Sequence, residues 1–492
     1  MTRRSPAAAL AALVVGAASA LGPAPVRAAG FYLGDVGAEA QARGGAFVAA
    51  PASVLAVHYN PAGLSLLDGL HVAVDVSVVD LEASFRRRCP CVDPGFGDPA
   101  TRRAVEAQLE GVFADNQAST RTPLVVPFLG AAYGFGPVSV ALAVYGPTSG
   151  RFDYGGLGPA SDPRFVERAR RKVTRYNALE APNLELNYAL GLAFEPQPGL
   201  RVGVGYYLHQ TGARQSLHLF ADTAFADGPE DPSWDVPVLL DFLSDPALNW
   251  GLGVSWDVPW VKGLTVGASY RAERSVEARG TITVDLPADL VGVATVEGDA
   301  VDVRLSIAPL ARLGVQYRQP GRFSIEAAAV WEGWSVNDRI LLRPEGIGFR
   351  IGDLEPVGLD EIVSERNWRD TASVRLGGSL ELWQPWLTLQ GGWFFEPSAV
   401  PRRWLDPSRI DLDKHGFALG AGAEWRGVKV QLAATYVTMQ GVTVEDSRAR
   451  NAAPLGFAPE LRTTVGNGDY AGQALIGTLG LGFSLDAFSE AR

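Results

Sequence analysis

The sequence contains few residues of the kinds that support metal, redox or nucleophilic chemistry, with two cysteines, two methionines and five histidines in 492 residues. The histidines are scattered, and none accompanies a nucleophile motif such as Gly-x-Ser-x-Gly. The cysteines stand in Cys89-Pro90-Cys91 and supply only half of a tetrahedral zinc site. We therefore expect no enzyme, no metal and no cofactor. A local disulfide and two loop thiols both remain open for Cys89 and Cys91.

Basic charge is also scarce, and there is only one long apolar run. The formal net charge of -11 argues against nucleic-acid binding, because phosphate backbones need a basic surface. The apolar run, Ala7 to Ala20, follows Arg3 and Arg4 and precedes the small-x-small site Val26-Arg27-Ala28. This order indicates a secretory signal peptide over 1–28. A membrane anchor is the alternative, but the run is shorter than the ~20 residues that a spanning helix needs.

The rest of the chain indicates a β protein, with 56 glycines and 12 tryptophans. In Leu264 to Arg271, Leu264, Val266, Ala268 and Tyr270 alternate with small or polar residues, which places them on one face of a strand. Similar segments of about ten residues recur to the C-terminus. We predict fourteen strands, beginning near Leu70, Arg121, Val138, Leu184, Leu200, Leu248, Leu264, Val301, Phe323, Trp368, Trp386, Phe417, Val428 and Ala474.

The connections between these segments alternate in length. Short turns such as Gln197-Pro198-Gly199 and Arg426-Gly427 alternate with long polar stretches such as Arg86 to Thr120. Short turns at one rim and long loops at the other are typical of an outer-membrane barrel. Tryptophan pairs near predicted strand ends are interpreted as an aromatic girdle, at Trp256 and Trp260, Trp331 and Trp334, and Trp383 and Trp386.

An even strand count favours a transmembrane antiparallel β-barrel of about fourteen strands, an all-β fold. Lipid cannot hydrogen-bond to a strand edge, so the last strand must pair with the first. Ala474 to Leu485 has the alternation that such a final strand needs. A soluble β-sandwich or propeller is the alternative, although no repeat of 20 to 50 residues is visible to support a propeller.

The segment before the first strand carries the most specific pattern. Ala29-Gly30-Phe31, Arg43-Gly44-Gly45-Ala46-Phe47-Val48 and Tyr59-Asn60-Pro61-Ala62-Gly63 follow one another in the order and spacing of the FadL-type outer-membrane transporters. Pro309 to Val315 and Asn367 to Thr371 continue the likeness. The chain therefore resembles this family over nearly its whole mature length.

The resemblance implies an N-terminal hatch over 29–69 inside a barrel formed by 70–492. It further implies a monomer in the outer membrane of a Gram-negative bacterium, in contact with lipid and lipopolysaccharide. The implied function is passive transport of hydrophobic compounds, most of all long-chain fatty acids, by capture on external loops and lateral release past the hatch.

Six hatch residues are candidate gate residues. Gly44 and Gly45 allow tight packing in a lumen, and Pro61 biases Asn60 toward extended geometry, which leaves the Asn60 amide available to the barrel wall. A moving gate and a fixed plug are both compatible with this pattern. The candidates are Phe31, Gly44, Gly45, Asn60, Pro61 and Ala62.

Two further sites follow from the resemblance. The family opens sideways at a kink in the third strand, for which Gly146 and Pro147 are candidates, although they can equally end that strand. The family captures ligands on two loops, and the segment Val236 to Leu243 is unusually apolar for a loop. A short rim helix is the alternative for it. The candidate capture residues are Phe220, Phe225, Trp234, Leu239, Leu240, Phe242, Leu290 and Val291.

Two other functions compete with this interpretation. A general diffusion porin for small polar solutes would show open conductance, whereas a hatched barrel would show little. An outer-membrane lipid hydrolase is the enzymatic alternative. The sequence does not name the ligand, and it does not choose between Arg151 and Arg175 as partners for a carboxylate.

Overall fold

The computed structural model describes residues 35–92, 97–114, 117–146, 150–159, 162–220, 229–286, 292, 294–352, 356–359, 361–383, 386–451 and 462–485. The predicted signal peptide over 1–28 lies outside this range. So do five candidate site residues and one side chain, namely Phe31, Pro147, Phe225, Leu290, Val291 and the side chain of Phe220.

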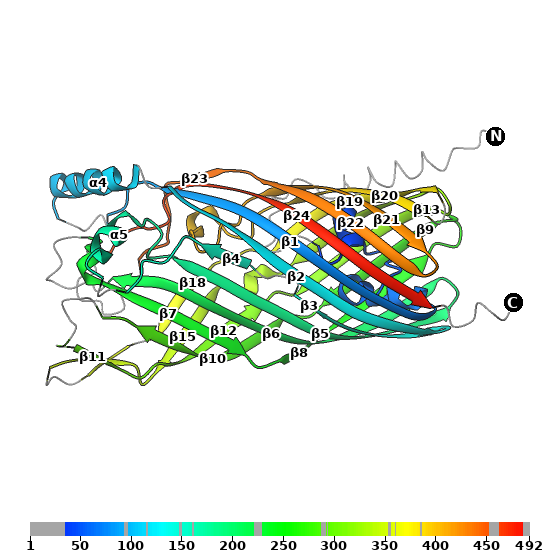
Figure 1. Ribbon diagram of the computed structural model, residues 1–492, viewed down its shortest axis with the longest axis horizontal. Coiled ribbons are helices and arrows are strands. Elements are labelled where there is room, and N and C mark those ends of the chain that lie inside the picture. The colour runs from blue at the N-terminus through cyan, green and yellow to red at the C-terminus, as the bar shows by residue number, and fades with distance from the viewer. Residues whose placement is uncertain are drawn as a thin grey trace.

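In the described part of the chain, fourteen antiparallel strands form one closed barrel. The first and last strands lie side by side (Figure 1) and pair from Leu70 opposite Leu485 to Arg87 opposite Gly468. In order around the barrel, the strands are β1 (Gly69–Arg87), β2 (Gln117–Phe135), β3 (Val138–Tyr145), β5 (Glu180–Gln197), β6 (Leu200–Phe220), β8 (Ala247–Asp257), β9 (Leu264–Arg271), β13 (Leu310–Gln319), β14 (Phe323–Glu332), β19 (Thr371–Trp383), β20 (Leu387–Glu396), β21 (Lys414–Trp425), β22 (Val428–Met439) and β24 (Gly468–Leu485).

Short turns join strands at one end of the barrel, called the turn end. At Arg426-Gly427 both residues have positive φ, 50° and 79°, as a two-residue hairpin turn requires. The other end, called the loop end, carries α4 (Pro99–Ala114) and α5 (Phe165–Arg171) (Figure 1). Among the described residues outside the N-terminal segment, the 3-10 helices are η2 (Pro232–Trp234), η4 (Trp334–Val336) and η5 (Arg402–Trp404).

Toward the loop end the wall continues in shorter strands. These are β4 (Gly150–Asp153), β7 (Asp235–Ser244), β10 (Arg274–Val284), β12 (Ala300–Ile307), β15 (Arg339–Glu345), β18 (Ile362–Glu365) and β23 (Val442–Val444). β6 pairs with both β8 and β7, so β7 and β8 extend along one line of the wall. A separate small sheet contains β11 (Ala294–Glu297), β16 (Gly348–Ile351) and β17 (Val357–Gly358).

The strands place apolar side chains outside and polar side chains inside. In β1, Val74, Val76 and Val78 are exposed, whereas Asp75 and Ser77 are buried in the interior. A lipid-facing surface requires this alternation. The barrel predicted from the sequence is therefore confirmed.

The fourteen predicted segments all overlap barrel strands, and five predicted starts coincide with the observed ones. The segment predicted from Val301 begins in β12 and continues after a break as β13. One girdle residue was wrongly placed. Trp334 is buried and packs against Trp368 at 5.2 Å between ring centroids, because it lies in η4 after β14 has ended, whereas Trp331 is exposed as predicted.

Candidate functional site

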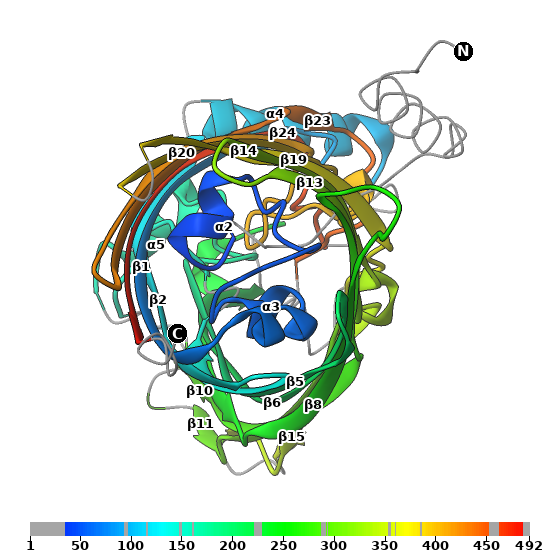
Figure 2. The ribbon, with the colours of Figure 1, turned by 90° about the vertical axis from the view of Figure 1, so that its right-hand side faces the viewer.

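Residues 35–67, which belong to the predicted hatch over 29–69, lie inside the barrel and are called the hatch from here on. Figure 2 shows α2 (Ala38–Ala42) and α3 (Ala56–Tyr59) within the ring of strands. α2 contacts β20, β21, β22 and β24, whereas the following 3-10 helix η1 (Pro61–Leu66) contacts β2, β3, β5, β6 and β8. Phe47 and Tyr59 in the hatch are buried, so the segment fills the lumen.

Asn60 ties the hatch to the wall. Its backbone is extended, with φ −156° and ψ 102°, as the following proline favours. The Asn60 side-chain amide donates to the carbonyl oxygens of Val48 at 2.8 Å and Val254 in β8 at 2.9 Å. Its Oδ1 accepts from the backbone N–H of Ala62 at 3.2 Å. One side chain thus joins two hatch segments to the barrel, and it is fully buried.

Gly44 and Gly45 form a turn that a side chain would disrupt. Their φ values of 60° and 75° lie in the left-handed region that favours glycine. A Cβ on Gly44 would lie 2.9 Å from the backbone nitrogen of Trp393 in β20. The facing position of the wall is also a glycine, Gly392. A Cβ on Gly392 would lie 2.1 Å from the carbonyl carbon of Arg43. Hatch and wall therefore meet here backbone to backbone.

One side of the hatch is joined to the wall by ion pairs that are buried or partly buried. Arg375 in β19 holds Asp35 and Glu396 at 3.0 Å each. Lys414 in β21 holds Glu396 at 3.0 Å. Two more pairs follow along the hatch, Glu39 with Lys429 at 2.8 Å and Arg43 with Glu326 at 3.2 Å. Glu326 also accepts from the backbone N–H groups of Val48 and Ala49.

The opposite side of the hatch is apolar. Buried hatch side chains such as Val54, Val57 and Leu64 form one cluster with Phe128 in β2, Ala141 and Tyr145 in β3, and Ala189 in β5. His58 stacks edge-on against Tyr145 at 5.1 Å between ring centroids. Its Nε2 faces Arg312 at 3.2 Å, so His58 packs and hydrogen-bonds within the barrel.

β3 ends beside this apolar side. It has eight residues, against 19 in β2 and 18 in β5, and its pairing with both neighbours stops at Tyr145. Gly146, the first kink candidate, follows directly and is buried, so the strand ends where the sequence placed the disturbance. β4 resumes pairing with β5 at Gly150.

A cavity of about 670 Å³ lies toward the loop end. Its walls come from β5, β6, β7, β10, β12, β15 and β18 and from the segments around η4 and η5. The apolar part of the lining includes Leu219, Val238, Leu240, Phe242, Ile282 and Leu342. Its size lies within the range of about 300–1,000 Å³ that is usual for small-molecule sites.

The segment Val236 to Leu243 is neither a loop nor a rim helix, and this part of the prediction was wrong. It is strand β7, paired with β6 and β10. Leu240 and Phe242 point into the cavity, whereas Leu239 is half-buried outside its lining. Trp234 is half-buried and packs on the same apolar cluster. The structure thus brings two of the predicted capture residues together in one cavity.

The same cavity carries basic residues that sequence reasoning missed. Arg366 Nε, Arg409 Nη1 and Asn451 Nδ2 are buried and have no hydrogen-bond partner among the described residues, although Arg366 Nη1 lies 3.9 Å from the Asp406 carboxylate. Burial lowers the pKa of Arg366 to about 10, so its guanidinium is charged at neutral pH. The arginines that line the cavity are Arg366, Arg409, Arg448, Arg450 and Arg462. Arg366, Arg409 and the group of Arg448, Arg450 and Arg462 come from three separate stretches of the sequence, and no local motif marks them.

Arg175, one of the two earlier candidates for a carboxylate partner, is already engaged. It donates to Asp235 at 2.8 Å and lies 3.5 Å from Glu230, with all three side chains buried. The side chain of Arg151, the other candidate, lies outside the described residues.

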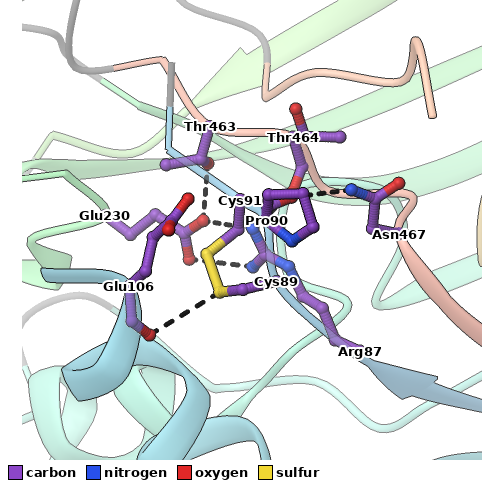
Figure 3. The surroundings of a disulfide bond; sticks show 9 residues. All are labelled: Arg87, Cys89, Pro90, Cys91, Glu106, Glu230, Thr463, Thr464 and Asn467. Carbon is purple, nitrogen blue, oxygen red and sulfur yellow. Dashed lines mark hydrogen bonds and ion pairs between the residues drawn. A yellow bond between two sulfur atoms is a disulfide. The ribbon is translucent and has the colours of Figure 1, made fainter. Parts of the chain in front are cut away.

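The same ion cluster reaches a disulfide at the loop end (Figure 3). Cys89 and Cys91 are bonded to each other, which resolves the pair in favour of the local bridge. Arg87, two residues earlier, donates to Glu230 at 2.9 Å. Burial alone would raise the pKa of Glu230, but the Arg87 and Arg175 guanidiniums outweigh it and hold that pKa below its usual range. Segments from three loops are thus joined beside the bridge.

A second cavity, of about 730 Å³, lies on the turn-end side of the hatch. Most of its lining is polar or charged, including Arg318, Gln390, Glu424, Lys429 and Gln431. The two cavities therefore differ in character, and the hatch separates them.

Two further features of the described residues concern membrane-spanning helices and metal sites. None of their helices has the length and apolar character needed to cross a bilayer. Nor do they contain a group of three or more His, Cys, Asp or Glu side chains placed to hold a metal ion.

A closed barrel with an internal hatch and an apolar cavity defines a channel protein of the outer membrane. The model of the family described as "Outer membrane protein transport protein (OMPP1/FadL/TodX)" matches residues 19–481. The chain belongs to this family, and it resides in the outer membrane of a Gram-negative bacterium. The resemblance seen in the sequence is confirmed.

Solved structures show the same fold. A FadL homologue of Pseudomonas aeruginosa is 16% identical with a TM-score of 0.70, over 92% of this chain and 99% of that one. The toluene transporter TodX of P. putida is 13% identical with a TM-score of 0.62, over 92% and 99%. The toluene transporter TbuX of Ralstonia pickettii is 14% identical with a TM-score of 0.59, over 92% and 100%. No curated protein matches the sequence.

Proposed function

We propose that this protein carries hydrophobic compounds passively across the outer membrane, and that long-chain fatty acids are its main substrates. The substrate enters the loop-end cavity, passes the hatch and leaves sideways into the membrane. We further propose that residues 1–28 are removed, that 29–69 act as the hatch of a monomer, and that lipid and lipopolysaccharide surround the barrel. FadL and toluene transporters share its family and fold, which supports transport and not catalysis.

The observation that carries the proposal is the composition of the loop-end cavity. Apolar side chains line one part, and transfer of an alkyl chain onto such a surface is favourable by about 0.8 kcal/mol per buried CH₂. Arginines line the other part, and three buried donor atoms there lack acceptors. Buried donors are normally paired, so the cavity suits a ligand that brings an acceptor. A fatty acid supplies both an alkyl chain and a carboxylate.

Lateral release is supported by the contrast between the polar turn-end cavity and the apolar side of the hatch next to β3. An apolar substrate that passed straight through would enter the polar turn-end cavity, where its surface gains nothing from burial. The end of β3 at Tyr145 instead borders the apolar side of the hatch. The pairing of β3 with β2 and β5 stops at Tyr145, and β4 resumes pairing with β5 at Gly150, so we propose the stretch of wall between these two residues as the path into the bilayer.

Replacement of Arg366 and Arg409 by glutamine tests the acid headgroup. We expect oleate binding to weaken about 10-fold or more, because hydrogen bonds to charged groups are worth about 1.5–3 kcal/mol. Methyl oleate, which lacks the charge, should bind within about twofold of wild type. Both affinities can be measured by fluorescent-ligand displacement from detergent-purified protein.

Arg403→Gln is the matched control for the arginine variants. Arg403 lies in η5, pairs with Asp446 at 2.7 Å and is about half exposed outside the cavity lining. Equal losses for oleate and methyl oleate in the Arg366 and Arg409 variants would refute carboxylate recognition, yet would leave transport of neutral compounds standing.

The apolar wall is tested by Leu240→Ser combined with Phe242→Ser. Both side chains line the cavity, so we expect oleate and methyl oleate to lose affinity alike, by about 10-fold or more, since full burial of such side chains is worth about 1.5–3 kcal/mol. Leu243→Ser is the control, because Leu243 lies on the opposite face of β7 and is 53% exposed. Unchanged uptake by correctly inserted Leu240/Phe242 variant would remove this strand from the capture site.

A further inference from the structure

A small backbone ribbon forms part of the wall around the loop-end cavity. Val92 lies opposite Thr463, and Arg450 lies opposite Thr464, each as an antiparallel bridge. The stretch with Thr463 and Thr464 therefore runs between two edges, of which the edge with Arg450 lines the cavity and the edge with Val92 does not. We call this feature the rim ribbon, and it comprises 91–92, 463–465 and 449–451.

Asn451, at the cavity edge of the rim ribbon, has an oriented side chain with an unused donor. The N–H of Thr463 donates to Asn451 Oδ1 at 2.8 Å, and the N–H of Asn451 donates to the Thr463 carbonyl oxygen at 3.1 Å. Because Oδ1 accepts a bond, the other amide atom is the nitrogen. This Nδ2 has no partner among the described residues, although Asn451 is only 2% exposed and lines the cavity. Buried donors are normally paired, so a ligand acceptor suits this position.

The far edge of the rim ribbon is fixed by the disulfide (Figure 3). The N–H of Thr464 donates to the carbonyl oxygen of Cys91 at 2.7 Å. The Asn467 side-chain amide donates to the carbonyl oxygen of Pro90 at 2.6 Å. The bridge spans a single intervening residue, and bridges over short loops stabilise a fold least. Its effect is therefore local, because it sets the direction of the two carbonyl groups that bind the ribbon.

From these contacts we propose that Asn451 is a specificity-determining residue whose Nδ2 donates to the carboxylate of the substrate, and that the Cys89–Cys91 bridge positions it through Thr463 and Thr464. This inference rests on the proposed function and adds a directional contact to the headgroup. Asn451 would touch the ligand, whereas the cysteines act only through the ribbon.

An amide donor selects between headgroups in a way that charge alone does not. A carboxylate accepts from N–H and an ammonium group cannot, since it has no acceptor atom. Hydrogen bonds to an ionised acceptor are also roughly twice as strong as neutral ones. Asn451 thus favours an acid over an amine of the same chain length.

The ribbon keeps other attachments when the bridge is removed. The Arg87 guanidinium donates to the carbonyl oxygen of Thr464 at 3.0 Å, and the Thr463 hydroxyl donates to Glu230 at 2.5 Å. Loss of the bridge therefore loosens one edge and leaves the ribbon in place. We expect Asn451 to lose its alignment while the apolar part of the cavity is unchanged.

Asn451→Asp tests the donor, because it keeps the oxygen that Thr463 binds and replaces Nδ2 by an acceptor. Affinities for oleate and oleylamine are measured by fluorescent-ligand displacement from detergent-purified protein. We expect the ratio of oleate affinity to oleylamine affinity to fall at least about tenfold, since the new carboxylate repels one headgroup and binds the other. Asn249→Asp is the matched control, because Asn249 is a buried asparagine in β8 outside the cavity lining, and its ratio should stay within about twofold of wild type. Heat-dependent gel mobility checks the folding of both variants.

Reduction of the wild-type protein tests the bridge and does not depend on any variant. We expect reduced protein, verified by thiol labelling and mass spectrometry, to bind oleate at least about threefold more weakly and oleylamine within about twofold of oxidised protein. Cys89→Ser with Cys91→Ser should match reduced wild type and ignore the reductant, because these are the only two cysteines of the chain. In Asn451→Asp protein, reduction should change oleate affinity less than about twofold, since residues that act through one another are not additive.

The other outcomes overturn the inference. An unchanged ratio in folded Asn451→Asp protein would remove Asn451 from the headgroup site. Equal losses of oleate and oleylamine on reduction would mean that the bridge supports the cavity as a whole, and an Asn451→Asp protein as sensitive to reduction as wild type would exclude a route through Asn451. Wild-type protein that binds neither oleate nor methyl oleate would overturn the proposed function itself, whereas binding of both with an unchanged ratio in the variant overturns only the role of Asn451.

Discussion

Replacement of Gly392 by leucine is expected to displace the hatch and open the barrel to ions. A Cβ at this position in β20 would lie 2.1 Å from the carbonyl carbon of Arg43 and 2.3 Å from the nitrogen of Gly44. Both are backbone atoms, so no side-chain rotation relieves the contact. Interiors are close-packed, and we therefore expect the ion conductance of the variant in planar bilayers to rise by about tenfold or more.

Gly477→Leu is the matched control for this experiment. Gly477 in β24 has open space where its Cβ would be, and it stands between Leu475 and Leu479 on the exposed face of the strand. Leucine there adds only lipid-facing surface, so conductance should stay at the wild-type level. Equal conductance in the two leucine variants would show that the hatch does not seal the lumen at Gly392.

The strand pattern could be predicted because it depends on local alternation. Leu264 to Arg271 alternates strictly, and it became β9 with the same bounds. Membrane barrels make this signal clear, because lipid lies outside every strand and a polar lumen lies inside. The alternation is a weaker signal where both faces of a strand are apolar. In β7, Val238 and Leu240 face the cavity while Leu239 and Leu243 are also apolar, and the segment was mistaken for a loop.

The side-chain network of the site could not be predicted, because its members are distant in the chain. Asp35 and Arg375 are separated by 340 positions, and the register of every intervening strand decides that they meet. The cavity arginines could not be predicted for the same reason, since Arg366 and Arg450 lie on different loops. The family pattern identified the hatch, and Asn60 in it bonds the wall as its turn predicts. The family pattern carried no information about which side of the hatch forms ion pairs with the wall.

The largest effect on stability is expected on the side of the hatch that ion pairs join to the wall. Arg375→Ala removes the one cation that bonds both Asp35, whose side chain is 13% exposed, and Glu396, whose side chain is 2% exposed. Lys414 still pairs with Glu396, whereas within the described residues Asp35 forms no other ion pair. A buried charge that loses its partner costs about 3–5 kcal/mol, so we expect the free energy of unfolding to fall by that amount.

The measurement is urea unfolding of the barrel in lipid vesicles, with Arg304→Ala as the control. Arg304 pairs with Glu277 on the exposed surface, and such pairs contribute about 0–1 kcal/mol. The destabilised Arg375→Ala hatch should also lose its hold on β19, so conductance should rise together with the loss of stability. A variant that loses stability but stays closed would mean that the remaining pairs, Glu39 with Lys429 and Arg43 with Glu326, hold this side of the hatch without Asp35. A variant as stable as the Arg304 control would contradict the structural role of the ion pairs, and this side of the hatch would then be held by the backbone contacts at Gly377 and Gly392.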